Sequence, residues 1–163
     1  MQKVTPCLWF NHDAEEAAEF YVTLLPDSRI DNVIRSPADN PSTEKGGVLL
    51  VDFTLAGQKY SGLNGGPQFR FTEAVSFMVH CEDQEEVDRL WNAILENGGE
   101  ASACGWIKDR WGLAWQITPQ RLLDMLASED REAAQRAMEK MMEMVKLDIA
   151  EIEAAYRGDS AAA

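Results

Sequence analysis

The sequence predicts an α+β fold, made of two βαβββ modules that are followed by a helical C-terminal extension. Three observations carry this prediction: an internal repeat with an offset of 70 residues, strand-like segments after each copy of a repeated helix, and a helical pattern after Pro119. The expected segments are residues 1–66 for the first module, 73–127 for the second, 128–157 for the extension and 158–163 for a disordered tail.

The repeat aligns residues 13–25 with residues 83–95 without a gap. Each copy begins with an Asp that can cap a helix, has acidic residues in the first turn and continues with apolar residues at helical spacing. A short apolar segment precedes each copy, at residues 7–10 and 75–79, and is expected to be a strand. Acidic residues could match by chance in two helix starts, but the ungapped register across strand and helix favours duplication of one module.

The segments after each helix have the composition of strands rather than of helices. In the first half these strands are expected at residues 28–35, 47–55 and 58–64, with a polar loop at 36–46. In the second half they are expected at residues 100–106 and 113–118, and a turn at Asp109-Arg110 can divide this region further. Residues 65–72 are expected to link the two modules.

After Pro119, helices are expected at residues 120–127, at the end of the second module, and at residues 130–144 and 147–156 in the extension. Four methionines and a valine crowd residues 138–145. At helical spacing such residues indicate a packed core or a face that contacts a partner subunit, rather than a cofactor site.

Charge and cysteine content exclude several classes of partner. The chain has 15 Lys and Arg against 28 Asp and Glu, a net charge of −13, which disfavours nucleic acids and anionic membranes. No segment reaches the length of a membrane span, and no signal-like apolar segment stands near the N-terminus. Three cysteines without paired spacing indicate free thiols, so a cytoplasmic protein is expected.

Five separated motifs resemble the vicinal oxygen chelate superfamily, the group of glyoxalases, extradiol dioxygenases and bleomycin-resistance proteins. The motifs are TPCLWF, DAEEAAEFY, SGLNGGPQF, AVSFMVHCEDQEEVDRLW and CGWIKDRWGLAWQITP. Together, over about residues 3–127, they look like the PhnB-like subfamily, whose domain is often labelled demethylubiquinone methyltransferase-like. The resemblance implies a glyoxalase-like fold in which the modules form a cup-shaped mixed sheet, often completed in a homodimer.

Metal-dependent members of the superfamily place His, Glu or Gln ligands on the first and last strands of each module. In this sequence those positions fall at Pro6, at Ser76, near Tyr60 and at Gln116. Proline cannot bind a metal and serine binds poorly, whereas a divalent transition metal usually needs at least three protein ligands. We therefore expect a cup without a metal site, and we expect no cofactor.

Other side chains are expected to face the cup. His80 shares the strand parity of Ser76 and could act as a base or a hydrogen-bond donor, although a histidine at a strand end is more often hydrogen-bonded at the rim. Asn64 shares the parity of Tyr60 and could donate to a ligand, but it fits a turn equally well. Cys81 is expected to be an inert buried thiol.

The segment CGWIKDRWGLAWQ, residues 104–116, is expected to form a hairpin with Lys108-Asp109-Arg110 as its polar turn. If Gln116 faces the cup, Trp115 faces the core. Trp106 and Trp111 can line a ligand site, or all three tryptophans can be core or dimer contacts. The predicted ligand-binding residues are Tyr60, Asn64, Ser76, His80, Trp106 and Gln116, and no catalytic residue is assigned.

The favoured function is binding of a small aromatic or apolar molecule by a homodimer. One alternative is a lyase, isomerase or dioxygenase with a metal or an unusual site around Tyr60, His80 and Gln116. Methyl transfer is not supported, because the chain lacks the glycine-rich strand-to-helix turn that nucleotide-containing cofactors favour. Another alternative is a scaffold whose C-terminal helices mediate assembly.

Overall fold

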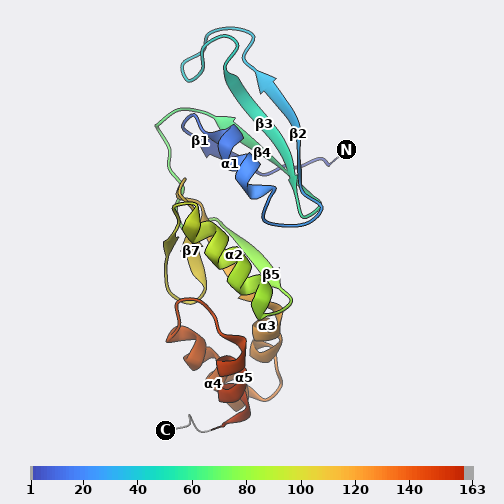
Figure 1. Ribbon diagram of the computed structural model, residues 1–163, viewed down its shortest axis with the longest axis vertical. Coiled ribbons are helices and arrows are strands. Elements are labelled where there is room, and N and C mark those ends of the chain that lie inside the picture. The colour runs from blue at the N-terminus through green and yellow to red at the C-terminus, as the bar shows by residue number, and fades with distance from the viewer. Residues whose placement is uncertain (1, 160–163) are drawn as a thin grey trace. The chain divides into compact units, whose positions relative to one another are not determined.

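A computed structural model describes residues 2–159, which form two compact units divided between Phe71 and Thr72 (Figure 1). Residues 2–71 are called unit 1 and residues 72–159 unit 2. Each unit holds one four-stranded sheet. The tail expected at residues 158–163 lies outside the described residues from residue 160 onward.

Unit 1 has the βαβββ order that the sequence predicts. Its elements are β1 (Cys7–Phe10), α1 (Ala14–Tyr21), β2 (Arg29–Arg35), β3 (Val48–Leu55) and β4 (Gln58–Asn64). The strands lie in the order β1-β4-β3-β2, with β1 parallel to β4 and the other pairs antiparallel. Helix α1 packs on one face of this sheet, where the Tyr21 ring lies 6.1 Å from the ring of the fully buried Phe53.

Unit 2 repeats this order. Its first elements are β5 (Ser76–Cys81), α2 (Gln84–Glu96), β6 (Glu100–Ala101), β7 (Trp106–Lys108) and β8 (Ala114–Pro119). The strand order is β5-β8-β7-β6, again with one parallel pair, β5 and β8, and α2 contacts all four strands. As predicted, Asp83 caps α2, because its carboxylate accepts a hydrogen bond from the Glu86 N–H.

The prediction of a single strand over residues 100–106 is wrong. The chain reverses direction between β6 and β7, which pair antiparallel, and Cys104 and Gly105 in this reversal have φ values of 59° and 81°. Two consecutive residues in the left-handed region cannot continue an extended strand. Trp106 therefore begins a new strand instead of ending the previous one.

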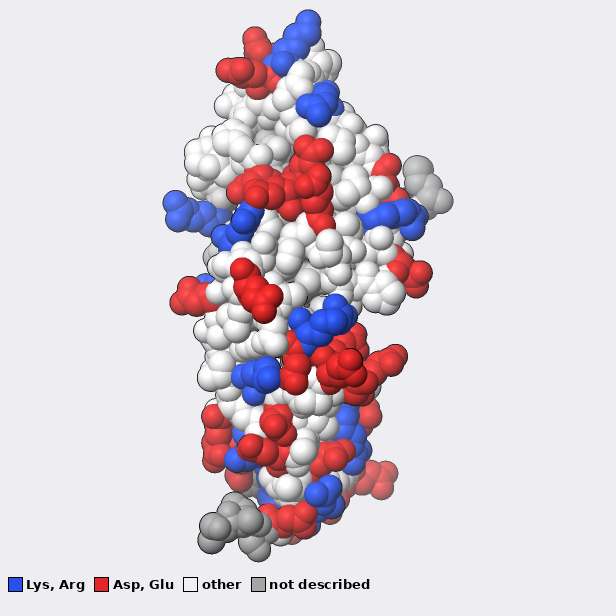
Figure 2. All heavy atoms as spheres, in the orientation of Figure 1, with Lys and Arg blue, Asp and Glu red and all other residues white. Residues whose placement is uncertain are grey.

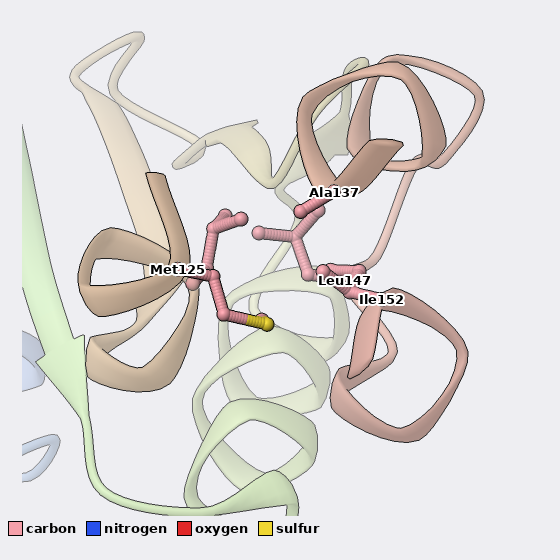
Figure 3. Packing of buried hydrophobic residues seen from close by; sticks show 5 residues of the cluster. Met125, Ala137, Leu147 and Ile152 are labelled. Atoms are coloured by element: carbon pink, nitrogen blue, oxygen red, sulfur yellow. The ribbon is translucent and has the colours of Figure 1, made fainter. Parts of the chain in front are cut away.

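Three helices follow β8: α3 (Gln120–Leu126), α4 (Arg131–Met142) and α5 (Ile149–Arg157). The name extension refers to all three from here on, although the sequence assigned the first of them to the second module. Side chains from these helices and from the segment between α4 and α5 meet in a small core, part of which Figure 3 shows. Its buried members are Leu122, Met125, Ala137, Leu147 and Ile152. Met141 and Met144 pack against this core, as the predicted core role of the methionine-rich segment requires, whereas Met138 and Met142 stay exposed.

Backbone hydrogen bonds fasten the extension to the rest of unit 2. The amides of Cys104 and Gly105 donate to the carbonyls of Met144 and Val145, both over 2.8 Å. Gln84, the first residue of α2, accepts from the Ile149 amide over 2.9 Å. The extension is thus connected directly to the residues that precede Trp106.

The predicted ungapped alignment of the two modules is wrong, because the turn between the first strand and the helix is one residue longer in unit 1 than in unit 2. The turn between β1 and α1 holds residues 11–13, whereas the turn between β5 and α2 holds only residues 82–83. The helices therefore match with an offset of 70 residues and the first strands with an offset of 71. Phe10 and Cys81 then coincide as the buried last residues of their strands, while an offset of 70 would place Phe10 on the exposed His80.

None of the helices described between residues 2 and 159 is long and apolar enough to cross a bilayer.

Candidate functional site

The face of the unit 2 sheet opposite α2, called here the helix-free face, carries four of the six predicted ligand-binding residues. Residues that pair directly across a sheet share a face, so the register identifies the members of this face. Its rows are Ser76–Ala114–Lys108, Met78–Gln116–Trp106 and His80–Thr118. Within it, the Gln116 side-chain amide donates to the Ser76 hydroxyl over 2.9 Å, so these two predicted residues are partners.

A cavity of about 200 Å³ opens beside β7 in unit 2. Its lining residues are Glu73, Ser102, Trp106, Ile107, Lys108 and Ala114. Trp106 supplies an aromatic wall and Ala114 a small apolar side chain on the same face, so this part of the lining suits an apolar or aromatic guest.

The cavity holds one ion pair. The Lys108 ammonium lies 2.5 Å from a Glu73 carboxylate oxygen, with side-chain exposures of 41% and 59%. Their hydrogen bond raises the pKa of Lys108 and lowers the pKa of Glu73. An ion pair this exposed is screened by water and contributes little to stability. Its two partners can therefore separate at small cost.

His80 lies at the end of the same face, away from the cavity lining. It is exposed, and its Nδ1 lies 3.1 Å from the side-chain oxygen of Gln120, the first residue of α3. This geometry is that of a hydrogen-bonded histidine at the rim of a sheet, the alternative role considered for it from the sequence.

The hairpin between β7 and β8 has a buried carboxylate at its centre. Asp109 is only 4% exposed; its Oδ1 accepts from the amides of Trp111 and Leu113, and its Oδ2 accepts from the Trp115 indole N–H, each over 3.0 Å. The sequence placed Asp109 in the polar turn of this hairpin, and it lies between β7 and β8 as expected, but the burial of its carboxylate was not predicted. Its role depends on an indole six residues away, which the local pattern does not indicate.

The tryptophans of this hairpin divide between core and surface. Trp115 is buried as expected, with its ring edge-on to Phe77 at 5.1 Å. Trp111 is half-buried under the guanidinium of Arg110, 4.7 Å from the ring centre. Of the two tryptophans considered for a ligand wall, Trp106 lines the cavity and Trp111 does not.

In unit 1, Tyr60 lies on the face of the sheet that α1 covers. It pairs directly with Phe53 on β3, and the two rings stack with centres 5.5 Å apart. Phe53 in turn contacts Tyr21 of α1, and burial raises the pKa of Tyr60. Tyr60 therefore lies on the opposite face from the one that its proposed metal-ligand position requires.

Asn64 also points to the α1 side. Its Oδ1 accepts from the Ala14 amide at the start of α1, and its Nδ2 donates to the Val48 carbonyl, both over 2.9 Å. Asp13, the residue expected to cap this helix, makes no such bond. Asn64, which lies on β4, thus caps α1 in place of Asp13. Both its side-chain oxygen and its side-chain nitrogen are hydrogen-bonded.

The true counterpart of Gln116 in unit 1 is Ser61. Ser61 pairs with Cys7 on the first strand, as Gln116 pairs with Met78, and an offset of 71 relates Cys7 to Met78. Ser61 donates to a carboxylate oxygen of Asp52 over 2.6 Å on the face opposite α1. Sequence reasoning placed this position only near Tyr60, and a shift of one residue along a strand exchanges its two faces.

The donors on these faces do not fit a divalent transition metal. Residues 2–159 contain no group of three or more His, Cys, Asp and Glu side chains placed to hold one. Burial and the nearby Asp52 carboxylate raise the pKa of Cys7, which disfavours the thiolate that a metal requires. Met78 and Trp106 stand beside Gln116 where further oxygen or nitrogen ligands would be needed.

Native-state thiol labelling should distinguish the cysteines. Cys81 is fully buried, and burial raises its pKa to about 12, so almost none of it is thiolate at pH 8. We expect one cysteine of the folded chain to resist iodoacetamide at pH 8 and to react only after denaturation, with peptide mass spectrometry identifying it as Cys81. Rapid labelling of Cys81 in the folded chain would contradict its place in the core.

Comparison with known proteins gives one matching family model and several similar solved structures. Residues 2–118 match the family model described as 3-demethylubiquinone-9 3-methyltransferase. A Bacillus cereus PhnB protein, itself described as a 3-demethylubiquinone-9 3-methyltransferase, is 32% identical, with a TM-score of 0.63 over 71% of this chain and 97% of that chain. Protein PA1353 from Pseudomonas aeruginosa is 21% identical, with a TM-score of 0.57 over 71% and 95% of the two chains.

A glyoxalase/bleomycin resistance protein from Albidiferax ferrireducens is also similar, at 16% identity and a TM-score of 0.45 over 70% and 95% of the two chains. Among curated proteins no relative matches. The matched family region ends at Thr118, so α3, α4 and α5 follow it, and the resemblance expected as far as residue 127 extends too far.

Proposed function

The chain belongs to the family described as 3-demethylubiquinone-9 3-methyltransferase, and we propose that it binds a small aromatic or apolar molecule on the helix-free face of unit 2. The observation that carries this proposal is the cavity beside β7, with Trp106 as its aromatic wall. Flat aromatic side chains at a concave surface offer large apolar area to a ligand. Ser76 and Gln116 lie next to it as hydrogen-bonding groups.

Methyl transfer is not part of this proposal. The turns from strand to helix, Asn11-His12-Asp13 and Glu82-Asp83, contain no glycine. Nucleotide-containing cofactors generally bind where glycines let the backbone approach them closely at such a turn. The family description therefore supplies the fold, and the chemistry of this site is argued from its own residues.

We further propose that binding needs no metal, that the protein acts as a homodimer and that it works in the cytoplasm. The donor set supports the first point, and the exposed Met138 and Met142 on α4 are compatible with the second. Free thiols at all three cysteines support the third. Figure 2 shows acidic side chains spread over the visible face with basic ones among them, which supports a small-molecule ligand rather than a nucleic acid.

Replacing Trp106 with Ala tests this function. We expect aromatic fragments that bind the wild-type chain in the millimolar range to lose about tenfold or more in affinity, since a stacked aromatic wall contributes about 1 kcal/mol or more beyond its area. Protein-observed NMR titration measures the change. Trp111→Ala is the matched control, because Trp111 belongs to the same hairpin but does not line the cavity. Equal losses in both variants would contradict the proposed site.

A further inference from the structure

The cavity beside β7 has two charged lining residues, Lys108 and Glu73, and they neutralise each other. The remaining lining residues, Ser102, Trp106, Ile107 and Ala114, are uncharged and offer these charges no further partner. An ion pair of this kind can stay formed, or it can separate so that one of its two residues binds a charged group of the ligand. Which partner is held in place by the fold decides the charge of the ligand that the cavity can accept.

Lys108 is the fixed partner. It stands on β7 with strands on both sides, paired with Ala114 on β8 and with Glu100 on β6. It shares the helix-free face with Trp106, two residues earlier on the same strand, so ammonium and indole border the same cavity. Glu73 precedes β5 in a segment outside the strands, and its side chain is the more exposed of the two. The sheet therefore holds the backbone of Lys108 on both sides, whereas Glu73 lies outside the sheet and is the partner that moves more easily.

We propose that this cavity selects small aromatic carboxylates, with Trp106 contacting the ring, Lys108 binding the carboxylate and Glu73 acting as the internal competitor that the ligand displaces. The inference rests on the proposed binding function and adds the class of ligand to it. Exchange of one carboxylate for another keeps Lys108 paired throughout. An aromatic cation would instead have to draw Glu73 away from Lys108 and leave the ammonium beside the ligand. Glu100 on β6 also lies near Lys108 and limits the gain in affinity.

Benzoate and benzamide are suitable probes, because they share a ring and differ in charge. We would titrate each into ¹⁵N-labelled protein and follow the Trp106 indole N–H, assigned from its loss in Trp106→Phe. Benzoate should bind about threefold to tenfold more tightly than benzamide in the wild-type chain. Glu73→Gln should tighten benzoate about threefold without changing benzamide, and Lys108→Met should remove the difference between the probes.

Lys146→Met and Asp88→Asn are matched controls. Their ion pair has a length of 2.6 Å and exposures of 39% and 42%, close to those of the Lys108 pair, and neither residue lines this cavity. These two variants should leave both affinities unchanged. Binding of benzoate and benzamide with equal affinity, or a benzoate preference that persists in Lys108→Met, would overturn the inference and leave the proposed function standing. If neither probe shifts the Trp106 signal, the proposed function and the inference both fail.

Discussion

Replacing Asp109 with Ala is expected to lower the free energy of unfolding of unit 2 by about 3 to 5 kcal/mol. The carboxylate accepts three hydrogen bonds inside the β7–β8 hairpin, two from backbone amides and one from the indole of the buried Trp115. Its removal leaves these donors without an acceptor at a site that water cannot readily reach. Each buried donor that loses its partner costs about 1 to 3 kcal/mol. Urea unfolding followed by tryptophan fluorescence measures the loss.

Asp109→Asn separates the contribution of the two oxygens. The remaining amide oxygen can still accept from the Trp111 and Leu113 amides, but the NH₂ group would meet the Trp115 indole N–H, donor against donor. We expect an intermediate loss of about 1 to 3 kcal/mol. Asp124→Ala is the control, because Asp124 is exposed and accepts from Gln120 on the surface of α3. A loss in Asp109→Ala no larger than in this control would refute the central role of Asp109.

Helices α1 and α2, one in each module, were predictable from the sequence. Acidic residues at the start of a helix and apolar residues at helical spacing are strong local signals. The faces of the short strands were not. A strand of four residues such as Cys7–Phe10 has too few positions to correct an alignment that the longer helices dominate. A single extra residue in the turn at 11–13 then exchanges the two faces. On β4 the position could be given only near Tyr60, and a shift of one residue likewise separates Ser61, on the face opposite α1, from Tyr60 and Asn64 on the α1 side.

The other differences between the prediction and the structure are side-chain hydrogen bonds to residues that are not neighbours in the sequence. The Asn64 side chain caps a helix 50 residues earlier, and Asp109 binds the indole of Trp115 across a turn. Polar residues at strand ends and turns have the same sequence signature whether they face solvent, a ligand or a neighbouring backbone. The sequence offered both Trp106 and Trp111 for a ligand wall, with core or dimer contacts as the alternative, and it placed Lys108 in the polar turn of the hairpin rather than at a cavity.

Gly105→Ala should be among the most damaging small substitutions in unit 2. Gly105 has a φ of 81°, where any other residue is strained, and an added Cβ would lie 2.8 Å from Leu147 Cδ1 and 3.1 Å from the Ile117 carbonyl oxygen. The methyl group would thus crowd the core of the extension. Residue 105 cannot move away freely, because its amide donates a hydrogen bond to the Val145 carbonyl. We expect a loss of about 3 kcal/mol, of which about 1 to 2 come from the backbone conformation and the remainder from crowding.

Gly112→Ala isolates the first of these contributions. Gly112 has a φ of 91°, and an added Cβ would meet nothing within 4 Å, so only the conformational cost of about 1 to 2 kcal/mol applies. Leu147→Ala, combined with Gly105→Ala, then tests the crowding. If the methyl group and Leu147 compete for the same space, the double variant should be at least 1 kcal/mol more stable than the sum of the single losses predicts.

The consequence for the site can be measured in the same proteins. Trp106 directly follows Gly105, so displacement of Gly105 by the extension should move the aromatic wall of the cavity. We expect Gly105→Ala to shift the Trp106 indole resonance and weaken fragment binding, and Gly112→Ala to leave both close to the wild type. If the two alanine variants prove equally stable, or if the double-variant losses simply add, the extension does not press on Gly105. It would then have no means of setting the position of Trp106.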